Sequence, residues 1–132
     1  MATNMITDGS FDPANFGAWS PSSPGHVSNP EENNYYCHID ASASVMQQCY
    51  PAPNVTYKVT FMSRGSDGGT VSFMESGGLV HKSQKITSSA DWQENTFEAT
   101  SDTTWGAGTL LHFQATDNGA LDIDNVIMVP AE

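Results

Sequence analysis

The stretch VTYKVTFM, from Val55 to Met62, decides the fold class of this sequence. Successive side chains of a β-strand point to opposite faces of the sheet, so alternating apolar and polar residues predict a half-buried strand. The residues that share the apolar face here are Val55, Tyr57, Val59 and Phe61. We therefore expect a strand with that face on the core.

The run that follows, residues 70–75, has the same alternation, with Val71 and Phe73 on its apolar face. The sequence RGSDGG at residues 64–69 separates the two runs, and glycine, serine and aspartate favour tight turns. The two runs are therefore predicted to form a hairpin in which Thr60 lies near Met74.

A second hairpin is predicted from residues 35–41 and 44–50, with a turn centred on Ala43 and with Ile39 and Val45 in the core. The directly opposite pairs are then Cys37 with Cys49, His38 with Gln48, and Tyr36 with Tyr50. In this register, the last two pairs share the face that points away from the core.

The two cysteines lie opposite each other in this register, which brings a disulfide between Cys37 and Cys49 within reach. A reduced, buried pair is the alternative. A metal site at the cysteines is disfavoured because the nearest histidine, His38, points to the opposite face.

The rest of the chain continues the β pattern. Further strands are predicted near residues 4–7, 18–20, 79–86, 93–99, 109–116 and 121–129. No sustained helical periodicity is present, so helix should be almost absent. Roughly ten short strands predict one all-β domain, residues 1–132, built as a two-sheet antiparallel β-sandwich.

The composition limits the classes of partner. Asp and Glu number 15 against 4 Lys and Arg, and the resulting net charge of −11 repels nucleic acid and anionic membrane surfaces. No apolar stretch approaches the roughly 20 residues that span a bilayer. The few basic residues, the possible cysteine pair and the sequon Asn54-Val55-Thr56 favour a secreted protein.

Several motifs together resemble a known family. They are NMITDGSFD at residues 4–12 followed by Trp19, DWQ at 91–93 leading into TF at 96–97, LHF at 111–113, and IDNV at 123–126. In this order they resemble carbohydrate-binding modules of the family 4, 9 and 22 type, over residues 4–129. The resemblance implies a galactose-binding-like jelly roll that binds a polysaccharide such as xylan or β-glucan without catalysis, beside a linked glycoside hydrolase.

The resemblance also implies a structural calcium ion held by Asp12 and Asp124, near the two ends of the chain. Calcium takes about six to eight oxygen ligands, which carboxylates and loop carbonyls can supply. Such an ion would join the first and last strands. The alternative is that Asp12 caps a turn before Pro13 and Asp124 is a solvated carboxylate at a strand end.

The candidate binding site is a polar sheet face. If Leu111 and Phe113 point into the core, His112 and Gln114 point to the other face of the same strand. The predicted carbohydrate-binding set adds Tyr36, His38, Gln48 and Lys58. Sugars pack their C–H faces on aromatic rings and pair their hydroxyls with such donors and acceptors. The resemblance gives the glycan-facing role to His112, and an ordinary surface histidine is the alternative.

The sequence departs from the family where aromatic residues are usual. Xylan- and glucan-binding members place Trp or Tyr on the cleft strands, and several of these positions here hold Met46, Met62 and Met74. Fewer stacking rings imply weaker binding or a different ligand, unless the methionines pack beneath a loop. The resemblance places Trp19 and Trp92 in the core, and Trp105 is predicted to be partly buried or at the rim.

Two other function classes are open. An enzyme of the same fold would need a positioned acid and base, and Glu75, Glu94 and Glu98 match no recognisable catalytic motif. An adhesive or assembly module of a virion or cell surface would bind protein through the same face. We expect a non-catalytic carbohydrate-binding module, with the adhesive module as the alternative.

Overall fold

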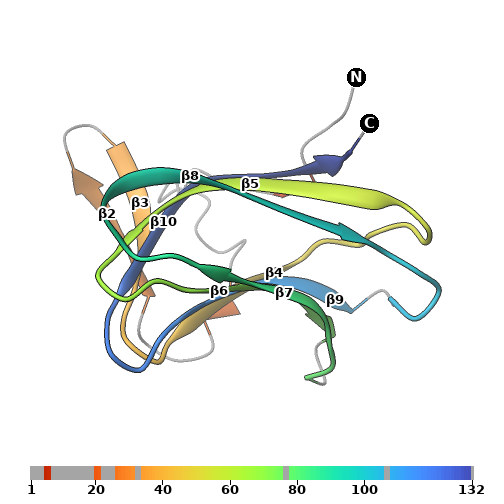
Figure 1. Cartoon of the computed structure of the whole chain (residues 1–132), viewed down its shortest axis with the longest axis horizontal. Coiled ribbons are helices and arrows are strands. Elements are labelled where there is room, and N and C mark those ends of the chain that lie inside the picture. The colour runs from red at the N-terminus through yellow and green to blue at the C-terminus, as the bar shows by residue number, and fades with distance from the viewer. Residues whose placement is uncertain are drawn as a thin grey trace.

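The computed structural model describes residues 5–6, 20–21, 26–31, 34–75, 78–105 and 108–131. In these ranges ten strands and no helix occur, and the strands form two five-stranded antiparallel sheets that stack on each other (Figure 1). This described part therefore has no helix long and apolar enough to cross a membrane. The predicted all-β sandwich is confirmed.

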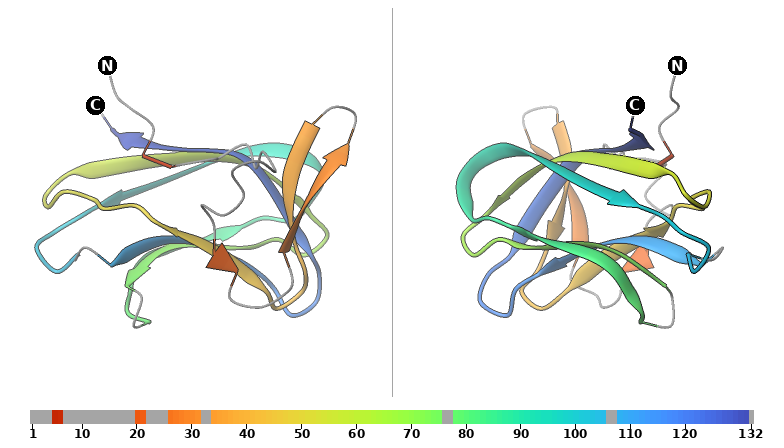
Figure 2. Two further views of the ribbon diagram at one scale, coloured as in Figure 1. Left: turned by 180° about the vertical axis from the view of Figure 1, so that it is seen from behind. Right: turned by 45° about the vertical axis from the view of Figure 1, so that its right-hand side comes forward.

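We name each sheet by its central strand. The β9 sheet contains, in spatial order, β1 (Ser20–Pro21), β4 (Ser44–Gln48), β9 (Thr109–Ala115), β6 (Gly69–Glu75) and β7 (Val80–Ile86). The β10 sheet contains β2 (His26–Glu31), β3 (Asn34–Ile39), β10 (Leu121–Pro130), β5 (Thr56–Gly65) and β8 (Ser89–Thr100). Figure 2 shows the two layers facing each other from two further directions.

The first predicted hairpin is wrong, because the chain crosses from one sheet to the other between β5 and β6. Thr60 pairs with Thr96 of β8 and does not lie beside Met74. Gly68, in the connection, has a φ of 71°, and a Cβ there would lie 2.1 Å from the carbonyl oxygen of Ile86. Only glycine tolerates this close approach, which packs the connection against the end of β7.

The second predicted hairpin is wrong as well, because β3 and β4 lie in different sheets. Cys37 lies opposite Ile123, whereas the N–H of Cys49 donates to the carbonyl oxygen of Thr109. Both cysteines are buried free thiols, so the disulfide predicted from that register is not formed. Burial raises the pKa of Cys49 to about 12, and nearby Glu75 adds to the shift.

Aromatic side chains join the two sheets in the core. Phe61 of β5 meets Phe113 of β9 edge to face, and Phe73 of β6 stacks on Phe97 of β8, with ring centroids 5.0 and 5.4 Å apart. Burial of one such side chain stabilises the fold by about 1.5–3 kcal/mol. The predicted core positions that are buried are Ile39, Val45, Tyr57, Val59, Phe61, Val71 and Phe73.

The strand β2 lies at the edge of the β10 sheet, and the alternation pattern does not reveal it. Its sequence, HVSNPE, is largely polar and contains Pro30. Proline has no backbone N–H to donate to a neighbouring strand, so it is tolerated at the edge of a sheet.

At the start of the described chain, the N–H of Met5 donates to the carbonyl oxygen of Met128 (2.8 Å). Residues 5–6 therefore lie along β10.

Candidate functional site

The six predicted carbohydrate-binding residues are divided between the two sheets. Gln48, His112 and Gln114 lie on β4 and β9 of the β9 sheet, while Tyr36, His38 and Lys58 lie on β3 and β5 of the β10 sheet. The prediction that all six share one face is therefore wrong. Its error follows from the hairpin that β3 and β4 do not form.

The outer face of the β9 sheet consists of the residues that alternate with the core residues along each strand. Val45, Leu111 and Phe113 are fully buried, so the side chains next to them on β4 and β9 project away from the core. The register then gives a central row across the sheet, which consists of Met46, His112, Ser72 and Ser83.

Two parallel rows flank the central one. One row consists of Gln48, Leu110, Met74 and Val80, and the other consists of Ser44, Gln114, Thr70 and Lys85. We call the three rows together the β9 face. Amides, hydroxyls and one imidazole on neighbouring strands can pair with the hydroxyls of a sugar. Of the predicted residues, Gln48, His112 and Gln114 thus share this face, each in a different row.

His112 is the central titratable group of the β9 face. Its side chain is partly buried between Met46 and Ser72, its neighbours on β4 and β6. This burial lowers the pKa of His112, because a less hydrated site disfavours the charged imidazolium. At neutral pH the ring is therefore neutral, and it offers one N–H donor and one acceptor to a ligand.

Tyr50 is a residue that the sequence analysis left out of the site. Its ring is 64% exposed, and its hydroxyl donates to Oε1 of Gln48 over 3.1 Å. An exposed ring beside a polar face can stack on the C–H face of a pyranose. The available signal was the spacing of two residues between Gln48 and Tyr50, which puts both on one face of an extended strand.

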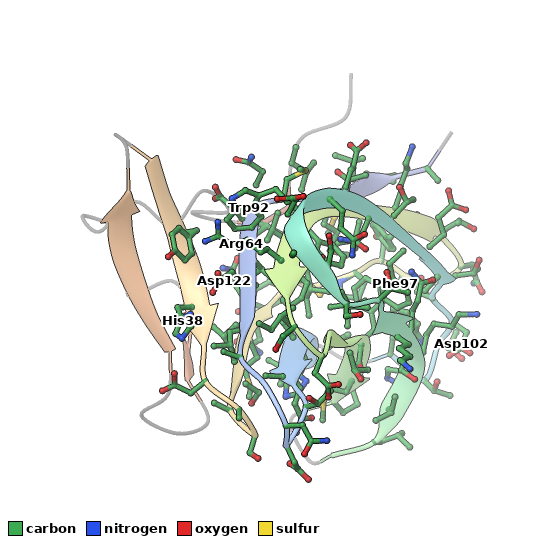
Figure 3. The ribbon with its side chains drawn as sticks, turned by 60° about the vertical axis from the view of Figure 1, so that its left-hand side comes forward. His38, Arg64, Trp92, Phe97, Asp102 and Asp122 are labelled. Atoms are coloured by element: carbon green, nitrogen blue, oxygen red, sulfur yellow. The ribbon has the colours of Figure 1, made fainter. Side chains whose placement is uncertain are left out.

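A different network occupies the outer face of the β10 sheet (Figure 3). The guanidinium carbon of Arg64 lies 4.5 Å from the ring centroid of Trp92 and 5.1 Å from that of Tyr36. The two rings meet edge to face at 5.6 Å. Tyr36 therefore packs on Arg64 and Trp92, in cation–π contacts that stabilise the sheet.

Asp122 of β10 connects this stack to His38. Nε and Nη2 of Arg64 donate to Oδ2 of Asp122 over 3.1 and 3.0 Å, and Nδ1 of His38 lies 2.6 Å from Oδ1 of the same carboxylate. Nε2 of His38 lies 3.2 Å from Oδ1 of Asp40. His38 is thus engaged on both ring nitrogens, away from the β9 face. Lys58 is exposed on the same side of the β10 sheet, opposite Glu98.

The tryptophans differ from the sequence-based expectation in one case. Trp92 is half-buried outside the core, stacked on Arg64, so its predicted core position is wrong. Trp105 is buried and packs on Phe73 and His81, with ring centroids 5.1 and 4.8 Å apart, which confirms the prediction of burial. Trp19 lies outside the described residues.

Of the two predicted calcium ligands, the structure describes only Asp124, because Asp12 lies outside the described residues. Asp124 is 3% exposed, and its Oδ1 accepts the N–H of Asn125 over 2.8 Å. The strand is irregular just beyond it, where the pairing with β5 shifts between Asp124 and Ile127. Within the described ranges no group of three or more His, Cys, Asp or Glu side chains is placed to hold a metal. A buried carboxylate fits one ligand position of a calcium ion, and the other oxygens would come from elsewhere.

Comparisons with known proteins identify the fold. No protein-family model and no curated protein matches the chain. Among solved structures, a family 4 carbohydrate-binding module is 18% identical with a TM-score of 0.74, and the match covers 96% of this chain and 99% of that one. A family 61 module, solved with β-1,4-galactotriose, is 14% identical with a TM-score of 0.69, over 98% and 99% of the two chains.

Other similar structures include domains of larger or catalytic proteins and further carbohydrate-binding modules. The enzymatically active domain of tailspike protein 4 from bacteriophage CBA120 is 14% identical with a TM-score of 0.72, over 97% of this chain and 21% of that one. Modules of carbohydrate-binding families 16 and 22 share the fold, with TM-scores of 0.71 and 0.65, as does a cyclase from Fischerella sp. TAU at 0.64. The chain thus has the jelly-roll fold of carbohydrate-binding modules.

Proposed function

We propose that this protein is a non-catalytic carbohydrate-binding module that binds a polysaccharide chain across the β9 face. The observation that carries the proposal is the outward projection of Gln48, His112 and Gln114 from adjacent strands of one sheet. These side chains supply neutral donors and acceptors, and Tyr50 supplies an exposed ring beside them.

The ligand class that we propose is a neutral polysaccharide such as xylan or β-glucan. The outward positions of β4, β6, β7 and β9 carry no Asp or Glu, and Lys85 is their only charged residue. His112 is neutral at physiological pH, since burial lowers its pKa. Similar modules were solved with xylohexaose and galactotriose, and a linked glycoside hydrolase and secretion belong to the same proposal.

The positions of the strand carboxylates support binding without catalysis. Glu75 lies on the core side of its sheet, where Oε2 accepts the hydroxyl of Thr109 and lies 2.6 Å from Nε2 of His81. Glu94 and Glu98 are exposed on β8, in the other sheet. Of these three carboxylates none lies on the β9 face, where an acid and a base would have to flank the sugar.

The proposal is tested by removing the central imidazole. We expect His112→Ala to weaken binding of xylan or β-glucan oligosaccharides by roughly 1–3 kcal/mol, about 5-fold to 150-fold, in isothermal titration calorimetry. The matched control is Lys58→Ala, an exposed residue of the opposite sheet, which should bind like the wild type. Wild-type affinity in His112→Ala, or no binding by the wild type to xylan, β-glucan, mannan or galactan, would contradict the proposal.

A second candidate function is adhesion or assembly on a virion or cell surface. It is favoured by the similarity to the phage tailspike domain and by two apolar side chains at the edge of the β9 face, Leu79 and Val80, which are 62% and 49% exposed. Such a module would bind protein through this face. A glycan array separates the two candidates, because only the first predicts a carbohydrate signal.

We also propose that Asp124, together with Asp12, holds a structural calcium ion. The support is the nearly complete burial of the Asp124 carboxylate on the last strand, since calcium is held in proteins by carboxylate and carbonyl oxygens. When bound, the ion would stabilise the fold without taking part in glycan binding, because Asp124 lies on β10 and the glycan site lies on the other sheet.

A further inference from the structure

One row of the β9 face differs from the others in chemistry. Leu110, Met74 and Val80 are consecutive members of this row, and they come from three adjacent strands. All three are at least partly exposed, and Leu79, the residue before Val80, is 62% exposed. An aliphatic patch thus lies at one end of a face that is otherwise polar.

The patch lacks the flat surfaces on which pyranose rings stack. None of the outward positions of β4, β6, β7 and β9 is Trp, Tyr or Phe, and Tyr50 provides a ring only beyond the end of β4. Sugar rings favour aromatic faces, whereas the rounded surfaces of aliphatic and thioether side chains can contact small apolar groups such as methyls, and the unbranched side chain of Met74 can adapt its shape to them. The patch is therefore suited to a substituent of the sugar more than to its ring.

Hydrogen-bonding groups lie directly beside the patch. His112 and Ser72, of the central row, are two residues from Leu110 and Met74 along their strands, a distance of about 6.8 Å. The imidazole of His112, which is partly exposed, can donate to a carbonyl oxygen, whereas Ser72 is only 5% exposed. One substituted sugar can therefore place a methyl group on the aliphatic row while a carbonyl oxygen accepts from the central row.

We infer that the polysaccharide bound by the β9 face is acetylated, and that the row of Leu110, Met74 and Val80 holds the acetyl methyl groups. An acetyl group combines the two features that the patch and its neighbours require, a methyl group and a carbonyl acceptor. It leaves the polymer uncharged, which suits a protein of net charge −11. This inference rests on the proposed function of the β9 face.

The test compares ligands that differ only in acetylation. Chitohexaose and cellohexaose differ in an acetamido group in place of a hydroxyl on each sugar, and native glucomannan differs from its alkali-treated form in acetate esters. We expect the wild type to bind at least one acetylated member about tenfold more tightly than its partner in calorimetric titrations or affinity electrophoresis. The amide and ester pairs distinguish the two sources of the acetyl group.

A conservative variant tests the row itself. Val80→Thr replaces one methyl group with a hydroxyl on a side chain that is 49% exposed, and we expect it to lower the affinity for the acetylated ligand at least threefold more than the affinity for the unacetylated ligand. The control is Ile127→Thr, at a residue that is 43% exposed on the other sheet, which should keep the preference.

The outcomes separate this inference from the proposed function. Equal affinity for both members of each pair would overturn the inference and leave carbohydrate binding in place. Binding of no glycan would overturn both. Concentration-dependent dimerisation of the wild type that Val80→Thr abolishes would show that a second copy of the chain covers the patch, and would also overturn the inference.

Discussion

At the scale of single residues, the two sheets use their polar side chains for different purposes. On the β10 sheet, Arg64 is fixed by two rings and by the carboxylate of Asp122, so its guanidinium serves the fold. On the β9 sheet, Gln48 and Gln114 are exposed, and they lie in the two rows that flank the central row of the β9 face. Residue type alone does not separate these roles: the side chains of Tyr36 and His38 would suit a sugar site, but β3 lies in the opposite sheet from β4 and β9.

Removal of Arg64 should destabilise the protein without an effect on glycan binding. Arg64→Ala removes the charged partner of Asp122, a carboxylate that is 14% exposed. It also removes the cation–π contacts with the rings of Tyr36 and Trp92. We expect a loss of about 2 kcal/mol in the free energy of unfolding, measured by urea denaturation. Lys58→Ala should change it by less than about 0.5 kcal/mol. A variant as stable as the wild type would contradict the structural role of Arg64.

The protonation of His112 should make stability depend on pH. Burial lowers its pKa in the folded protein, so the unfolded chain binds this proton more readily and gains stability relative to the native state as pH falls below about 6.5. The free energy of unfolding of the wild type should therefore fall more between about pH 7.5 and pH 5 than that of His112→Gln. Parallel pH profiles of the two proteins would contradict a neutral, partly buried imidazole.

At the scale of the elements, the sequence was sufficient to predict most strands and their buried faces, with β2 as an exception, and insufficient to predict which strands pair. The alternation in β5 and β6 is local, so it identifies Phe61 and Phe73 as core residues. Pairing depends on contacts between distant segments, such as β10 with β3 and β5, which alternation does not encode. Both wrong hairpins arose from the assumption that consecutive strands are neighbours.

The proposed calcium site involves the last strand, β10, and it predicts an effect of calcium on stability. If Asp124 of β10 is a ligand, calcium should raise the melting temperature relative to the chelated protein, with a stabilisation of about 2.7 kcal/mol at a hundredfold excess over the dissociation constant. Asp124→Asn should lose most of this calcium-dependent shift, whatever its own melting temperature. Identical melting with calcium and with chelator in the wild type would remove the calcium site.

At the scale of the whole molecule, the sandwich explains why half of the candidate site was predictable. His112 and Gln114 follow from the alternation of one strand around Leu111 and Phe113, and the structure places Gln48 on the same face of the neighbouring strand. The assignment of Tyr36, His38 and Lys58 needed the sheet order, which divides β3 and β5 from β4 and β9. The alternation of residues thus identifies the buried and exposed faces of each strand. Only the order of strands in the two sheets shows which strands present their exposed residues on the same surface.

The central claim is that polysaccharide binds to the β9 face. Its most direct test is a titration of the isotope-labelled protein with the glycan that it binds best on an array, followed by backbone amide chemical shifts. We predict that the largest changes lie on β4, β6 and β9, around Gln48, Ser72 and His112, while β5, β8 and β10 stay nearly unchanged. Shifts concentrated on the β10 sheet, around Arg64 and Trp92, would contradict the claim.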